Sequence, residues 1–469
     1  MDARGPFSRG YSANRTKYKM RHMQMATSFT GRGVRYPAPD VARGFMLLFV
    51  AVANVPTWNK VPANVIVGTF PVPAADAWWV FVRTLLVDHR AYPLFAMLFG
   101  FGLMTMINRR IASGTQSYLQ SLPGVDAGRE PTPLEESWAR EQATVDARRL
   151  VRRRGWWMIL FGFVHGIVFS GDIIGAYGLA AVIFAGWFAH KRYVRLYVVG
   201  AIIALTAFSL FLVMSFVSPE TAAVWSGQQE NPTVTMLPWF VVNIANWFFF
   251  LFVQILVTLI VPAAAIGARL ADTGIITQPD RHRRLLISTG IGGLALGALA
   301  ALHSALTNVL PVSQWPWDFA VKELFGIVGA CGWLALLALY AGGPREDGRL
   351  TGLRRLASAV GRRSMTAYLS QTILFGTIFV IVPVLVMGQR LWVGQAGGAL
   401  IALAVGQRLW VGQAAAALIA LAVWVVTVVL CAVLERGGHA GPFETLLRTA
   451  VARSERPRPI PPPAADSGA

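Results

Sequence analysis

The sequence predicts an all-α fold: a polytopic membrane bundle of about ten transmembrane helices, with both termini in the cytoplasm. Hydrophobic residues make up 55% of the 469 positions, and the mean hydropathy is +0.52. Only 14% of the residues are charged, whereas a soluble globular protein carries about 25%. Of the 42 Lys and Arg residues, 35 lie in the two termini and in every second loop, the distribution that orients membrane proteins.

Ten apolar stretches come close to the length that a membrane span requires. A bilayer core of ~30 Å needs roughly 20 apolar residues as a helix. The stretch "DAWWVFVRTLLVDHR", at 76–90, is too short and too charged to cross, and its paired tryptophans favour a helix lying at the outer interface. The ten predicted spans are 41–57, 91–108, 155–171, 173–190, 194–217, 239–266, 286–306, 321–341, 365–387 and 414–434.

These spans divide the chain into three parts. Residues 1–39 form a basic cytoplasmic tail, expected to be disordered. Residues 40–434 form the transmembrane domain, with a basic cytoplasmic loop at 109–154, and residues 435–469 form a Pro-rich cytoplasmic tail. The net charge of +19 resides mainly in the loops, so the expected partner is the lipid bilayer and not nucleic acid.

One local repeat interrupts the last part of the membrane domain. The segment "GQRLWVGQAGGALIALAV" at 388–405 recurs at 406–423, with sixteen of eighteen positions identical. Such identity indicates a recent duplication and not a repeat architecture. The apolar run of the first copy is too short to span, so we expect 388–405 to be an insertion at the outer face.

Polar groups at membrane depth are the main candidates for function, because placing them there is costly. In "FVHGIVFSGDIIGAYG", at 163–178, residues 170–172 predict a tight turn between two antiparallel helices. We expect Asp172 to cap the second helix, and His165 and Tyr177, each six residues from the turn, to meet across the hairpin. His165 is then either a catalytic or ligand-binding base partnered by Tyr177, or a packed core histidine. On the first interpretation His165→Gln abolishes function, whereas Asp172→Asn is mild.

Three further places carry polar candidates. Asp40 and Arg43 are spaced to share one face at the cytoplasmic start of the first span, and Asn54 lies near its outer end. His89 and Arg90 stand at the outer start of the second span. Each set also has a structural interpretation, as an interface anchor, a solvated surface cluster or a polar seam between helices. On the ninth span, three polar side chains share one helix face: Ser364, Tyr368 and Gln371. No pattern indicates a metal site.

Five ordered blocks carry a family resemblance: "APDVARGFMLLFVAVANV", "DHRAYPLFAMLFGFG", "LFGFVHGIVFSGDIIGAYG", "GRRSMTAYLSQ" and "AGPFETLLR". They resemble the bacterial membrane family called domain of unknown function 418 (DUF418), over about residues 35 to 448. The resemblance implies the bacterial cytoplasmic membrane. The first block is also similar to the start of membrane acyltransferases, in which an Asp-x-x-Arg-Gly motif precedes a histidine needed for acyl transfer. Asp40, Arg43 and Gly44 match, but Asn54 stands at the histidine spacing and cannot act as a base near neutral pH. His89 and His165 are the candidates to replace it.

Three function classes remain open. The first is a membrane enzyme that transfers an acyl or similar group, with acyl-CoA as the candidate donor, to an envelope glycan, a lipid or an exported acceptor. The second is a small-molecule transporter that binds its solute between helices with the same polar groups. The third is a non-catalytic envelope assembly protein. Because transporters often contain two related halves and none is detectable beyond the duplication, the enzyme is favoured.

Overall fold

The computed structural model describes residues 36–59, 73–125, 128–169, 171–217, 239–313, 315–343, 350–382 and 411–455. Within these residues every regular element is a helix, as predicted, and eight helical stretches are long and apolar enough to cross a membrane. They are Pro37–Trp58, Ala74–Gln120, Tyr193–Val213, Phe240–Val257, Arg283–Leu306, Asp318–Ala341, Ser364–Ile381 and Gln413–Arg436. Ten spans and cytoplasmic termini stay predictions.

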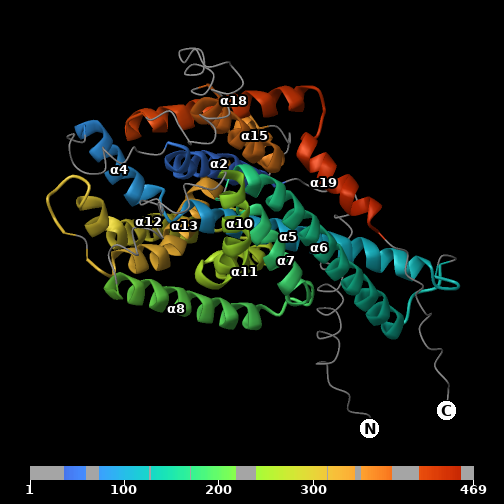
Figure 1. Cartoon of the computed structure of the whole chain (residues 1–469). Coiled ribbons are helices and arrows are strands. Elements are labelled where there is room, and N and C mark those ends of the chain that lie inside the picture. Colours follow the sequence, from blue (N-terminus) through green and yellow to red (C-terminus); the bar gives the residue numbers. More distant parts are fainter. Residues whose placement is uncertain are drawn as a thin grey trace, which may run out of the picture.

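In the described residues of the first half, five helices accompany α4 (Ala74–Leu86), which occupies the predicted interfacial stretch. They are α2 (Pro37–Trp58), α5 (Ala91–Gln120), α6 (Pro133–Val168), α7 (Ile174–Ala189) and α8 (Tyr193–Val217). Helices α6 and α7 form the predicted antiparallel hairpin, and α5 packs alongside α6. Both α5 and α6 run past the rest of the bundle and project from it together (Figure 1).

The second half contains α10 (Trp239–Val257), α11 (Ile260–Thr273), α12 (Arg283–Leu306), α13 (Asp318–Ala341), α14 (Gly352–Arg362), α15 (Ser364–Gly376), the π-helical turn η2 (Thr377–Ile381), α18 (Gln413–Arg436) and α19 (Pro442–Arg453). Helices α12 and α13 form a second closely packed pair, and α14 packs against α2.

Three expectations change in the structure. The segment 109–154, expected as a loop, consists mostly of the end of α5 and the start of α6. The span expected at 239–266 is two helices, α10 and α11, which meet at residues 258–259. The tail expected at 435–469 includes α19, which packs against α6 and α15. Apolar runs mark the membrane-embedded part of a helix, but hydrogen-bonded turns continue beyond it for as long as packing and caps support them.

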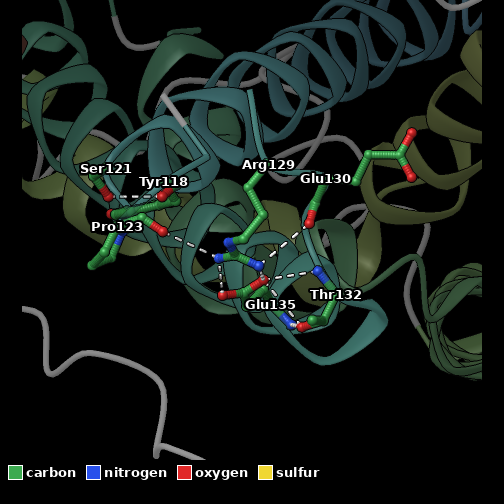
Figure 2. Close-up of polar contacts among 7 residues, drawn as sticks. All are labelled: Tyr118, Ser121, Pro123, Arg129, Glu130, Thr132 and Glu135. Atoms are coloured by element: carbon green, nitrogen blue, oxygen red, sulfur yellow. Dashed lines mark hydrogen bonds and ion pairs between the residues drawn. The ribbon is translucent and has the colours of Figure 1, made fainter. Parts of the chain in front are cut away.

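A complete capping box explains why α6 begins at residue 133. The Thr132 hydroxyl accepts from the Glu135 backbone N–H at 3.3 Å, and Glu135 Oε2 accepts from the Thr132 N–H at 2.8 Å. Figure 2 shows the Arg129 guanidinium facing the Glu135 carboxylate, with Nη2 2.7 Å from Oε1 and Nη1 3.1 Å from Oε2. These contacts fix the start of a helix whose other end carries His165.

Small residues set the distance between neighbouring helices. A Cβ atom on Gly267 would lie 1.8 Å from the carbonyl oxygen of Met97, and one on Gly100 would lie 2.0 Å from that of Ala264. Helices α5 and α11 therefore touch backbone to backbone, which only glycine permits.

The tail 1–35 and the first repeat copy, 388–405, lie outside the described residues. Of the second copy, the described part includes the start of α18, which occupies the predicted tenth span.

Candidate functional site

His165 sits at the centre of a buried hydrogen-bonded chain. Its Nδ1 lies 2.7 Å from Asp172 Oδ1, and its Nε2 lies 2.8 Å from Thr372 Oγ1. The three residues come from α6, the hairpin turn and α15, and all are buried. When Nδ1 carries the imidazole proton and donates to Asp172, Nε2 is left to accept the Thr372 hydroxyl proton. This is the order of groups, orienter then base then hydroxyl, that activates nucleophiles in hydrolases.

Asp172 has the capping role that the sequence predicts, and more. Oδ1 accepts the Ile174 backbone N–H at 3.1 Å, and Oδ2 accepts that of Gly175 at 2.8 Å. Oδ2 also accepts from Trp247 Nε1 at 3.2 Å. With His165, four donors converge on this carboxylate, so both of its oxygens are satisfied although it is buried.

Glycines let the partners approach His165. A Cβ on Gly162 would lie 2.4 Å from the backbone nitrogen of Gly175, and one on Gly166 would lie 2.2 Å from Trp247 Cδ1. The GxxxG spacing around His165 therefore admits α7 on one side and the indole of α10 on the other. His165 is buried against protein.

The expected pairing of His165 with Tyr177 is wrong. The Tyr177 hydroxyl donates to the carbonyl oxygen of Tyr92 at 3.1 Å, and its ring stacks on Phe95 at a centroid distance of 4.9 Å. The ring of Tyr368 contacts His165 instead, with 5.2 Å between the two ring centroids. Equal distance from a turn places two residues at one depth, but helix rotation decides which way each side chain points.

Aromatic rings from two separate apolar clusters meet at His165. Tyr368 belongs to the larger core cluster, together with Tyr177. Phe169, 5.7 Å from the imidazole, belongs to the second, where it stacks on Trp58 at 5.3 Å. The histidine is thus a polar centre between two apolar layers.

Four polar residues of α15, namely Ser364, Tyr368, Gln371 and Thr372, have three different roles. Gln371 Nε2 donates to the Leu47 carbonyl at 3.2 Å and ties α15 to α2, which is the structural role considered for it. Ser364 lines a cavity at the other end of the helix, and Tyr368 contacts His165. Thr372 was missed by the sequence reasoning, although it follows Tyr368 by four residues and so lies on the same face.

The expected outer cluster at His89 and Arg90 has its own partners. His89 Nδ1 lies 2.7 Å from Glu323 Oε2, and the Tyr92 hydroxyl donates to the same carboxylate. Arg90 is fully buried and donates to backbone carbonyls, among them that of Thr84 at 3.0 Å. Arg90 therefore satisfies buried backbone carbonyl groups. His89 and Glu323 form a pair that is distinct from the His165 centre. Glu323 was not predicted.

The motif at the start of α2 opens onto a cavity. Arg43 Nη1 lies 3.3 Å from Asp40 Oδ1, as the spacing predicts, and Nη2 donates to the Leu98 carbonyl at 3.1 Å. Both side chains line a cavity of about 590 Å³. Asn54 lies half-buried farther along α2. In the described part of the chain, no three His, Cys, Asp or Glu side chains gather in a way that would hold a metal ion.

The comparisons with known proteins give one match. Residues 270–410 match the family model described as protein of unknown function (DUF418). This match confirms the DUF418 resemblance, and the apolar helices indicate a multi-pass membrane protein. The DUF418 match includes Glu323 and Thr372, whereas His165 and Asp172 precede it. No curated protein and no solved structure matches the chain.

Proposed function

We propose that this protein is an enzyme of the bacterial cytoplasmic membrane that transfers an acyl or similar group, with His165 as the general base. The hydrogen-bonded chain from Asp172 through His165 to Thr372 is the observation that carries the proposal. A base needs to lie within ~3.2 Å of the proton it takes, and a third group that orients the imidazole is typical of such sites.

The chemistry assigned to each residue follows from these contacts. His165 Nε2 takes the proton of a hydroxyl as that oxygen bonds to the carbonyl carbon of the acyl-CoA donor. The C–S bond of the thioester breaks, and the CoA thiolate leaves with the proton that His165 returns. Asp172 holds the imidazole with Nε2 free to accept and stabilises the positive charge that develops on the ring. The hydroxyl is that of Thr372 or of an acceptor taking its place, and the envelope glycan, lipid or exported acceptor expected from the sequence would approach from the outer side.

The test follows a radioactive acyl group from acyl-CoA into the membrane fraction of a deletion strain that carries variants. We expect His165→Gln to abolish labelling while protein level and insertion hold, because glutamine keeps a hydrogen bond but supplies no base. Thr372→Val removes the hydroxyl at nearly the same side-chain volume, whereas Thr372→Ser keeps the hydroxyl. Comparing the two variants therefore shows whether the hydroxyl itself is required. Full labelling with His165→Gln would refute the proposed base.

A transporter is the second candidate, and the burial of the centre favours it. His165 is 6% exposed and contacts rings from both apolar clusters, so a ligand would reach it only after the helices move, as alternating access requires. The two functions differ in what they need. Group transfer persists in detergent-solubilised protein, whereas transport is measurable only across a sealed vesicle.

A further inference from the structure

The cavity behind Asp40 and Arg43 lies between α2, α5, α6, α14, α15 and α19 and holds about 590 Å³. Asp172 does not line this cavity, which lies where several basic segments of the chain come together. Its lining contains more guanidinium groups than carboxylates. The arginines are Arg43, Arg153, Arg154, Arg362 and Arg448, and the acids are Asp40, Glu444 and Glu455.

Each of these three carboxylates already has a partner. Asp40 pairs with Arg43, and Glu455 pairs with Arg153 at 3.1 Å. Glu444 caps α15, where its Oε1 accepts the backbone N–H of Met365 at 2.7 Å. The acids of the cavity are therefore committed to ion pairs and to a helix cap.

Two arginines remain for a ligand. Among the residues that the structure describes, neither Arg154 nor Arg448 forms an ion pair. Arg154 Nη1 donates to the sulfur of Met106 at 3.6 Å, a weak acceptor. Burial, and then the positive charges of Arg43 and Arg448, lower the pKa of the Arg154 guanidinium, and the nearby Glu444 carboxylate offsets only part of this effect. Several positive charges thus lie close together around the partly desolvated Arg154, and a bound anion would reduce their mutual repulsion.

Apart from Ser364, the remainder of the lining consists of glycine and apolar side chains. Phe95 and Phe99 come from α5, and Met46 comes from α2. Phe95 also stacks on Tyr177, so the apolar end of the cavity adjoins the core cluster that contains Tyr177. A ligand that fills this space presents its charge to the arginines and an apolar part to these side chains.

We infer that this cavity binds a phosphate-bearing amphiphile, with the phosphate at Arg154 and Arg448 and an alkyl or aromatic part on Met46, Phe95 and Phe99. A phosphate offers several oxygens to the forked donors of two guanidinium groups, which a single lysine-type charge would not match. The volume is within the range typical of small-molecule sites. The inference concerns binding and is independent of the chemistry proposed at His165.

The experiment measures calorimetric binding of hexyl phosphate to the full chain in nanodiscs of neutral phosphatidylcholine, with empty discs subtracted. We expect Arg154→Gln and Arg448→Gln each to weaken binding about tenfold, the loss of roughly one charge-assisted hydrogen bond (about 1.4 kcal/mol). Arg152→Gln is the matched control, because Arg152 belongs to the same basic run but is exposed and does not line the cavity.

Two further ligands separate the sources of the effect. Hexanol lacks the charge and inorganic phosphate lacks the alkyl part, and we expect each to bind at least tenfold more weakly than hexyl phosphate. Inorganic phosphate binding equally well would overturn the amphiphile assignment. Equal weakening by Arg152→Gln and Arg154→Gln would show only a general charge effect and would overturn the site. Arg448 is exposed, so its variant keeps the test valid if Arg154→Gln fails to fold.

Discussion

Asp172→Asn is the substitution for which the structure changes the expectation most. From the sequence, Asn keeps most of the capping ability and the change is mild. The structure places two donors on each carboxylate oxygen: His165 Nδ1 and the Ile174 N–H on Oδ1, and the Gly175 N–H and Trp247 Nε1 on Oδ2. An amide has one oxygen, so two of the four donors would face an N–H group.

The size of the effect follows from these two donors. A buried donor left unpaired costs about 1–3 kcal/mol, so two of them cost about 2–6 kcal/mol. Hydrogen bonds between membrane helices average nearer 0.6 kcal/mol, which favours the lower end of that range. Even about 2 kcal/mol is a large part of a typical stability of 5–15 kcal/mol.

The assay is unfolding by titration with sodium dodecyl sulfate from mixed micelles, followed by circular dichroism. Asp280→Asn is the control, because Asp280 is exposed and the same chemical change there should alter the free energy of unfolding by less than about 0.5 kcal/mol. If Asp172→Asn is as stable as this control, the four donors do not depend on the carboxylate, and the account of the His165 centre is wrong.

Three further predictions follow. Cysteine labelling from outside the cell should reach a probe placed near Glu230, which lies outside the described residues, and should miss one near Glu135, because basic segments stay in the cytoplasm; the opposite pattern would reverse the topology. Gly267→Ala should lower the free energy of unfolding by about 3 kcal/mol, since its Cβ would lie 1.8 Å from the Met97 carbonyl oxygen, whereas Gly292→Ala, with nothing within 4 Å, should be neutral within about 0.5 kcal/mol. The hydrogen bond from Arg129, and then that from the Thr132 N–H, lower the pKa of Glu135 to about 2. That pKa is depressed from 4.5, so amide hydrogens in the first turn of α6 should exchange more slowly in the natural chain than in Glu135→Gln. This difference should be full above pH 4.5 and vanish toward pH 2; a difference that persists at pH 2 would contradict the cap.

Some features of this protein are determined by residues close together in the chain. Apolar length and basic loops predict a multi-pass helical protein, because a bilayer imposes both on any span. Asp40 with Arg43 and Asp172 with the start of α7 were equally readable, since contacts at two to four residues depend only on local helix geometry.

Other features depend on how the helices pack. His165 and Thr372 are 207 positions apart, and His89 and Glu323 are 234 apart. No local pattern specifies such pairs, because the rotation of each helix and the backbone contacts at Gly162 and Gly267 decide which faces meet. For the same reason the Tyr177 hydroxyl contacts Tyr92, and His165 contacts Asp172 and Thr372. The sequence determined which groups lie in the membrane, and the tertiary packing decided which of them form a site.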